Sequence, residues 1–171
     1  MVVAGVEEIV VPADETPGRI RLVVCGVLLA LYTGVVLTIT MWPTQPDQGY
    51  ASLVDRLIGL LHRNGVPVWF GFGEFEFSAN VAMFVPLGFL LALTLPERVS
   101  WLSFPLLPAF SVLIEVTQGL FLPERFATVS DVLANTFGGC IGAVLALGLR
   151  AVVHERDRLV IARVLAVVPV R

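Results

Sequence analysis

Two apolar runs joined by a short loop make up residues 111–142, which read S-V-L-I-E-V-T-Q-G-L-F-L-P-E-R-F-A-T-V-S-D-V-L-A-N-T-F-G-G-C-I-G. Each run carries polar side chains that a lipid environment would exclude. Glu115 and Gln118 in the first run are three residues apart, so they share one face of a helix. Asp131 and Asn135 in the second run are four apart and also share a face. The stretch predicts two antiparallel helices whose polar groups meet near their connecting loop.

The composition of the whole chain is that of an integral membrane protein. Of its 171 residues, 57% are hydrophobic and 15% are charged, and the mean hydropathy is +0.88. A soluble domain carries about 25% charged residues, so this chain has too few to cover a soluble surface. Its apolar runs approach the roughly 20 residues that cross a bilayer core. The lipid bilayer is therefore the first expected partner.

The same composition argues against other classes of function. The net charge is −3 and no basic block is present, so no nucleic-acid partner is expected. Cys25 and Cys140 both lie in apolar runs, where we interpret them as small hydrophobic residues rather than a disulfide pair or metal ligands. No second histidine or cysteine is spaced to join His62 at a metal. We expect neither a metal site nor a cofactor.

Four apolar runs predict an all-α, polytopic membrane protein that forms a four-transmembrane-helix bundle. The runs cover residues 20–41, 79–95, 101–122 and 130–149. Trp42 and Pro43 end the first run as an interfacial aromatic residue and a helix breaker. Ser78 is the expected N-cap of the second run.

The connection between the first two spans is expected to contain a short amphipathic helix. Apolar residues from Leu53 to Leu61 recur at helical spacing between Asp55, Arg56 and His62. This helix would lie on the membrane surface or cap the bundle, and both alternatives stay open. The stretch W-F-G-F-G-E-F-E-F at residues 69–77 predicts interfacial aromatics or, because Phe and Glu alternate, a short extended segment.

These spans predict three parts in the chain. The parts are an N-terminal tail at residues 1–19, the four-helix transmembrane domain at residues 20–149, and a basic and apolar C-terminal tail at residues 150–171. Within the last part, residues 159–170 are apolar but interrupted by Arg163 and too short to span. That segment is expected to be either an amphipathic surface helix or disordered.

Small residues recur every four positions on the first and fourth predicted spans. They are Gly26, Ala30 and Gly34 on the first, and Ala134, Gly138, Gly142 and Ala146 on the fourth. Such stripes let a second helix approach closely in a membrane. They therefore mark faces for packing, either within the bundle or against a membrane-protein partner.

The arginines predict the orientation of the spans. With four spans both termini share one side, which would hold eight of the eleven basic residues. By the positive-inside rule both termini are then cytoplasmic, in the cell membrane. Polar residues from the second, third and fourth spans and the last loop would gather near the outer side. They are Asn80, Glu115, Gln118, Arg125, Asp131 and Asn135, and they form the candidate binding site.

Each of these residues also has a purely structural interpretation. Glu115 is either a binding or catalytic group, or a clamp that accepts hydrogen bonds from Gln118, Asn135 or Arg125. For Asp131 we favour a structural role, because it lies in a first helical turn and forms a capping-box pattern with Thr128. Arg125 would pair with one of these acids or anchor a lipid or glycan phosphate.

Three segments between residues 80 and 149 carry a resemblance. They are N-V-A-M-F-V-P-L-G-F from Asn80, I-E-V-T-Q from Ile114, and R-F-A-T-V-S-D-V-L-A-N-T-F-G-G-C-I-G from Arg125. In this order and spacing they resemble the VanZ-like family of small bacterial membrane proteins. The resemblance implies a multi-pass protein of the cell envelope. It also implies a link to antibiotic resistance, since the named member is associated with low-level teicoplanin resistance. It brings no catalytic residues.

Three functional hypotheses follow, in order of preference. The first is an outer-side polar pocket for a lipid, a lipid-linked glycan or a lipophilic glycopeptide. The second is a membrane scaffold that recruits a partner protein through its small-residue helix faces. The third is an enzyme acting on an envelope lipid intermediate, with Glu115 or Asp131 as general base. No nucleophile–base motif supports the third, so we lean against catalysis.

Overall fold

The computed structural model describes residues 16–42, 46–122 and 128–167, and every element within these ranges is a helix. The elements are α1 (Thr16–Thr40), α2 (Pro46–Arg63), α3 (Phe72–Thr94), a 3-10 helix η1 (Glu97–Leu102), α4 (Ser103–Phe121) and α5 (Val129–Val167). The predicted all-α class is confirmed. Side chains are described for residues 20–42, 53–122 and 128–163.

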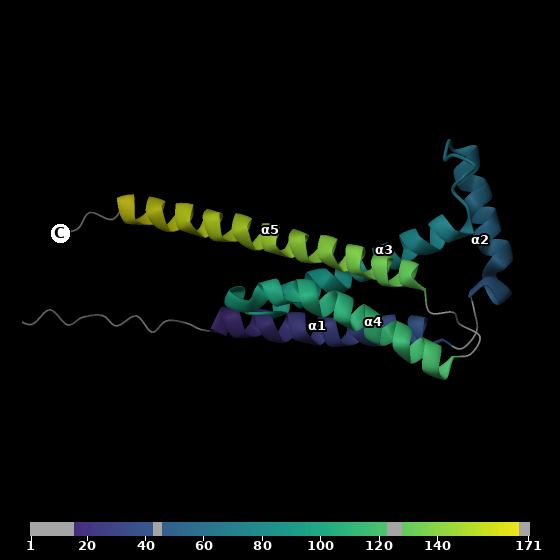
Figure 1. The fold of residues 1–171 in the computed structure, drawn as a ribbon. Helices are drawn as coiled ribbons and strands as arrows, with labels where there is room; N and C mark the ends of the chain where they lie inside the picture. Colours follow the sequence, from purple (N-terminus) through teal and green to yellow (C-terminus); the bar gives the residue numbers. More distant parts are fainter. Residues whose placement is uncertain (1–15, 43–45, 123–127, 168–171) are drawn as a thin grey trace, which may run out of the picture.

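Four helical segments are long and apolar enough to cross a membrane. They are Ile20–Thr40, Phe72–Thr94, Glu97–Phe121 and Val129–Arg163. Figure 1 shows α1, α3, α4 and α5 running alternately up and down the bundle, with α2 lying crosswise at one end. We call this end the α2 end and the opposite one the termini end. The predicted four-span bundle, with a helix between the first two spans, is confirmed.

The closest helix pair is α3 and α5, and glycines make it close. A methyl group at Gly138 would overlap the backbone carbonyl of Val81, and one at Gly142 would overlap that of Val85. Across the same interface, a methyl group at Gly88 would overlap the backbone of Gly139. The small-residue stripe of the fourth span therefore packs α5 against α3 within the chain.

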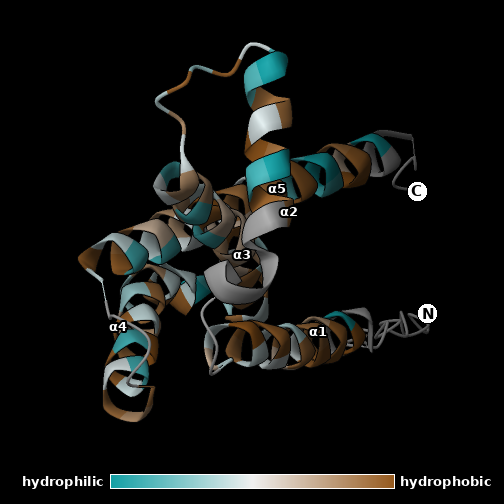
Figure 2. Ribbon diagram, turned by 90° about the vertical axis from the view of Figure 1, so that its right-hand side faces the viewer, coloured by the Kyte–Doolittle hydropathy of each residue, from teal (hydrophilic) through white to brown (hydrophobic). Residues whose placement is uncertain are grey.

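Helix α1 packs less tightly and exposes most of its apolar surface. The hydroxyl of Tyr32 on α1 donates a hydrogen bond to the carbonyl of Met83 on α3, at 2.9 Å. That carbonyl lies in the turn before Pro86, one residue after the carbonyl that loses its i+4 donor to the proline. Among the described residues, the α1 stripe has no neighbour at its glycines, since no atom lies within 4 Å of a Cβ built at Gly26 or Gly34. Figure 2 shows α1 as largely hydrophobic along its length.

Helix α2 is amphipathic, as expected, and ends in a glycine turn. Gly65 has a φ of 95°, and the N–H of Val66 bonds back to the Leu61 carbonyl at 3.0 Å, the hydrogen-bond pattern of a Schellman motif. His62 donates to the carbonyl of Phe70 at 2.9 Å, which ties the following loop to the helix. Ile58 is buried while Leu57 is exposed, so one side of α2 faces the bundle.

The predicted start of the second span at Ser78 is wrong. Helix α3 begins at Phe72, and the Glu74 carboxylate accepts the N–H of Gly71 at 2.9 Å in the manner of a capping box. The extended alternative for residues 69–77 is therefore also wrong from Phe72 onward. Tertiary packing outweighs the Phe/Glu alternation, because Phe72, Phe75 and Ala79 recur at helical spacing along one lined face.

Helix α5 is 39 residues long and continues far beyond the predicted end at residue 149. At 1.5 Å per residue it is about 58 Å long, nearly twice a hydrocarbon core of ~30 Å. Neither glycine nor proline occurs between Leu149 and Val167, so nothing stops the helix there. Of the two alternatives for residues 159–170, disorder is wrong up to Val167, because this segment is helical and continuous with α5, and its location at the membrane surface stays a prediction. Residues 151–163 are exposed and extend past the bundle (Figure 1).

Arg150 joins α5 to the end of α3 where α5 leaves the bundle. Its Nη2 donates to the carbonyls of Leu93 and Leu95, at 2.6 and 2.8 Å. The last carbonyls of a helix have no partner within that helix. An arginine from a neighbouring helix therefore caps α3 at the termini end.

Candidate functional site

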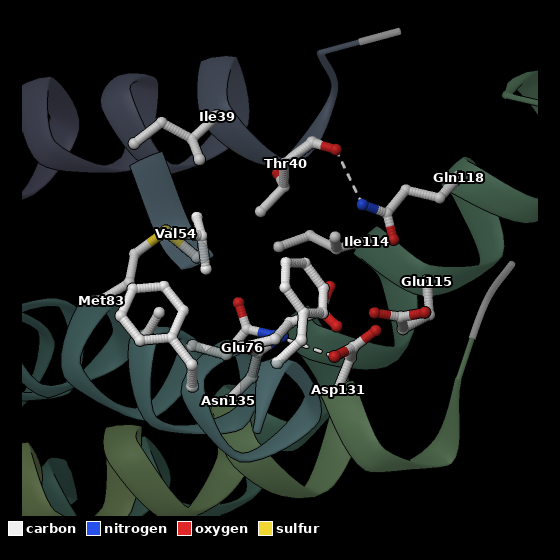
Figure 3. A pocket seen from close by; sticks show the side chains of 14 residues that line it. Ile39, Thr40, Val54, Glu76, Met83, Ile114, Glu115, Gln118, Asp131 and Asn135 are labelled. Carbon is white, nitrogen blue, oxygen red and sulfur yellow. Dashed lines mark hydrogen bonds between the residues drawn. The ribbon is translucent and has the colours of Figure 1, made fainter. Parts of the chain in front are cut away.

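A polar pocket lies inside the α2 end of the bundle, with a volume of about 200 Å³ (Figure 3). Its apolar side chains come from α1, α2, α3 and α4. The polar lining residues are Thr40 of α1; Glu76 and Asn80 of α3; Glu115 and Gln118 of α4; and Asp131 and Asn135 of α5. The apolar ones are Ile39, Val54, Phe72, Phe75, Ala79, Met83 and Ile114.

The end of α1 enters the pocket through a backbone carbonyl. Gln118 is buried, and its Nε2 donates to the carbonyl of Thr40 at 2.7 Å. That carbonyl lies in the last turn of α1, where the helix supplies no N–H for it. The Thr40 hydroxyl bonds to its own helix, at 2.9 Å from the Val36 carbonyl. The bond from Gln118 to the Thr40 carbonyl therefore links α4 to the C-terminal end of α1.

A second bond joins α3 to α5. The Nδ2 of Asn80 donates to Oδ1 of Asp131 at 2.8 Å (Figure 3). The other carboxylate oxygen of Asp131 accepts the Thr128 hydroxyl at 2.8 Å, and the Thr128 hydroxyl oxygen accepts the Asp131 N–H at 3.1 Å. The capping role predicted for Asp131 is thus present, and the same carboxylate also reaches across to α3.

Glu115 faces the interior and serves the start of α5. Its side chain is only 6% exposed, and its Oε2 accepts the backbone N–H of Thr128 at 3.0 Å. The amide groups expected to donate to it make other bonds. Gln118 donates to Thr40, and Asn135 donates through Nδ2 to the Ser111 hydroxyl at 3.1 Å. Glu115 therefore ties α4 to the N-terminal end of α5 through backbone.

Asn135 is the most deeply buried polar residue that lines the pocket. It is 2% exposed, and its Oδ1 has no hydrogen-bond partner. Buried polar side-chain atoms are bonded in the large majority of cases. An acceptor oxygen without a donor is therefore an unusual feature of the pocket wall.

Comparison with known proteins agrees with this architecture. A family model described as VanZ/LLP1 matches residues 27–151, well over half of the chain. The chain belongs to the VanZ/LLP1 family. With its four apolar helices it is an integral membrane protein. No curated protein matches the chain, and no solved structure does.

The VanZ match includes the whole polar pocket and stops next to Arg150. Its boundary at residue 151 coincides with the point where α5 leaves the bundle. The three VanZ-like segments of the sequence each supply pocket residues, from Asn80, from Glu115 and Gln118, and from Asp131 and Asn135. The family match thus covers the helices that build the pocket.

The pocket brings together five of the six residues predicted from the sequence. They are Asn80, Glu115, Gln118, Asp131 and Asn135, from three spanning helices. The sixth, Arg125, lies outside the described residues, so its pairing with an acid stays a prediction. Whether these residues bind a ligand is likewise still a prediction.

Two polar contributors were absent from the sequence prediction. Thr40 contributes through its carbonyl, and the signal was the helix end marked by Trp42 and Pro43. Glu76 was placed before the second span, where the Phe/Glu alternation obscured the helical spacing. Among the described residues, no group of three or more His, Cys, Asp and Glu is arranged to hold a metal ion.

Proposed function

We propose that this VanZ protein binds the polar part of an envelope amphiphile in the pocket at its α2 end. The amphiphile would be a lipid, a lipid-linked glycan or a lipophilic glycopeptide. The pocket would open toward the outer side of the cell membrane, where Arg125 would engage an anionic part of the ligand. Through such binding the protein would act in envelope physiology, including resistance to glycopeptides such as teicoplanin.

The observation that carries this proposal is a cavity at one end of a membrane bundle, whose wall combines seven polar with seven apolar residues. A bundle held together only by a structural network would fill this space with side chains, because protein interiors pack closely. Here a volume of about 200 Å³ stays between the carboxylates and amides. Polar groups within spanning segments usually face each other or a functional cavity.

The volume of the pocket also limits the size of the ligand group that it can hold. Sites for drug-sized ligands measure about 300–1,000 Å³, and this pocket has about 200 Å³. It accommodates a head group or a single sugar-sized moiety rather than a whole glycopeptide. The rest of the ligand would lie in the bilayer or outside the protein.

The proposed orientation rests on charge. Four spans put the start of α1 and the end of α5 on one side, and eight of the eleven arginines belong to that side. The positive-inside rule then favours cytoplasmic termini and an outer α2 end. An outer pocket is also where a lipid-linked glycan or a glycopeptide would be met.

A susceptibility assay tests this function. We expect Glu115→Ala to abolish any teicoplanin tolerance that the wild-type gene gives a susceptible host, at unchanged membrane abundance. Thr117→Val is the matched control on α4, because the Thr117 hydroxyl bonds only back to its own helix at Leu113 and does not line the pocket. Tolerance that falls only in proportion to abundance would make Glu115 purely structural.

The glycines of α1 support a second candidate, a scaffold for another membrane protein. The α5 stripe is used within the chain, whereas Gly26 and Gly34 of α1 face no described neighbour. A partner helix would pack on this face at close range. Leucine at Gly34 should then abolish co-purification of the partner while leaving the pocket intact, and unchanged co-purification would remove this candidate.

A further inference from the structure

We propose that the head group in the polar pocket is a primary ammonium, held between Asp131 and Asn135 on successive turns of α5. This inference rests on the proposed function, in which the pocket receives the polar end of an amphiphile. It narrows the ligand to a membrane aminolipid, such as one with an ethanolamine head group.

The amide nitrogens of the pocket are already directed at the protein. Among the described lining residues, three side chains carry such a donor, and each one bonds to an acceptor on another helix. Asn80 donates to Asp131, Gln118 to the carbonyl of Thr40, and Asn135 to Ser111. Each of these NH₂ groups has a second N–H, so donors alone do not decide which ligand fits, and the acceptors and charges of the walls decide instead.

One acceptor oxygen on the pocket wall has no donor among the described residues. Asn135 lines the pocket and is only 2% exposed. Its Oδ1 has no hydrogen-bond donor among the described residues. A buried acceptor without a donor is costly, because it has lost water and gained nothing. A ligand N–H would supply the missing bond.

Asp131 lies one turn before Asn135 and adds negative charge. Its two oxygens accept one bond each from Asn80 and Thr128. A carboxylate has about four lone-pair sites, so further donors can still approach. The positive end of the α5 dipole disfavours a cation here, and the charge of Asp131 in the first turn offsets it.

A primary ammonium matches this wall in charge, donors and size. It carries three N–H donors and no acceptor, as a lysine side chain does. No described lining residue is basic, and the negative charge of Asp131 on this wall disfavours an anion beside it. The volume of about 200 Å³ is suited to an aminoethyl group.

Three lipids with identical acyl chains separate charge from hydrogen bonding. Phosphatidylethanolamine has a cation with N–H donors, phosphatidylcholine has a cation without them, and phosphatidylglycerol has no cation. Each is titrated into the full-length, detergent-solubilised protein, and binding is measured by native mass spectrometry. We expect phosphatidylethanolamine to bind at least tenfold more tightly than either of the others.

Variants of α5 locate the site. Asn135→Leu removes the acceptor and should lower phosphatidylethanolamine affinity to that of phosphatidylglycerol. Asn135→Asp keeps an acceptor and adds charge, so the preference for phosphatidylethanolamine should persist. Thr117→Val serves as the control outside the pocket and should change neither affinity. Thermal unfolding of each variant verifies that it is folded, and the wild-type series does not depend on any variant.

The outcomes separate this inference from the proposed function. Equal binding of all three lipids, with all three weakened by Asn135→Leu, would overturn the ammonium and leave the pocket as a binding site. Equal binding of phosphatidylethanolamine and phosphatidylcholine would also overturn it, because charge alone would suffice. A preference for phosphatidylethanolamine that the folded Asn135→Leu variant retains would overturn the site itself.

Discussion

At the scale of single residues, Arg150 of α5 makes two hydrogen bonds to the end of α3. One of its guanidinium nitrogens holds the carbonyls of Leu93 and Leu95 at the end of α3. Hydrogen bonds to charged groups contribute about 1.5–3 kcal/mol each. Arg150→Ala should lower the free energy of unfolding by about 2 kcal/mol, because α3 would lose its cap. Unfolding of purified protein by SDS titration in mixed micelles measures this.

Arg158 provides the control for that measurement. It lies on the same helix and pairs only with Glu155, at 3.7 Å, with both side chains well exposed. Exposed pairs of this kind contribute little. Arg158→Ala should leave unfolding unchanged, and an equal loss in both variants would show that charge on α5, rather than the cap, stabilises the protein.

Tyr32 gives a smaller residue-scale prediction. Its hydroxyl donates to the carbonyl of Met83 on α3, at 2.9 Å. Interhelical hydrogen bonds in membranes average about 0.6 kcal/mol and reach about 1.7. Tyr32→Phe should therefore destabilise the fold by about 1 kcal/mol, measured in the same unfolding titration. No change would mean that α1 is held by apolar packing alone.

Residue by residue, the sequence predicted which side chains meet better than how they bond. Spacing put Glu115, Gln118, Asp131 and Asn135 on helix faces near one end, and they do line one pocket. Backbone partners such as the Thr40 carbonyl were not predictable, because any residue type supplies the same carbonyl. Only the helix end after Thr40 made it available.

At the scale of elements, apolar length predicted the spans, but the ends of two helices were missed. The N-terminal extension of α3 was hidden because aromatic and acidic residues alternate there, a pattern with two interpretations. The extension of α5 was hidden because charged residues after Arg150 resemble a tail. Packing against the other helices sets the start of α3, and α5 continues past Leu149 because no glycine or proline interrupts it.

The interface between α3 and α5 gives an element-scale prediction. Leucine at Gly138 would collide with the backbone of α3 at Val81, which no side-chain rotation relieves. Gly138→Leu should therefore abolish folding, measured by size-exclusion chromatography after mild extraction. Gly26→Leu on α1 is the control and should fold normally, since nothing lies near that position. Normal folding of Gly138→Leu would contradict this helix pairing.

Truncation tests the exposed part of α5. Residues 151–163 are exposed throughout, so a chain ending at residue 151 should fold with unchanged stability. A chain ending at residue 145 loses buried Ala146 and the cap from Arg150, and should not fold. Thermal unfolding of the extracted proteins compares the two. Loss of folding in the longer truncation would show that the exposed part of α5 stabilises the bundle.

At the scale of the whole molecule, the VanZ bundle has two unlike ends. The α2 end contains the pocket and has α2 across it (Figure 1), whereas at the termini end Arg150 of α5 caps the last carbonyls of α3. In this account head-group binding is a property of the α2 end, and the rest of the bundle holds the helices around it. The proposed function therefore requires that an amphiphile occupies the pocket at the α2 end.

Native mass spectrometry of gently extracted protein tests that claim most directly. The wild type should retain an amphiphile of defined mass. A folded Asn80→Leu, Asn135→Leu double variant, which fills the pocket from α3 and α5 with apolar side chains, should be bare. An amphiphile retained equally by both proteins, or by neither, would contradict the account.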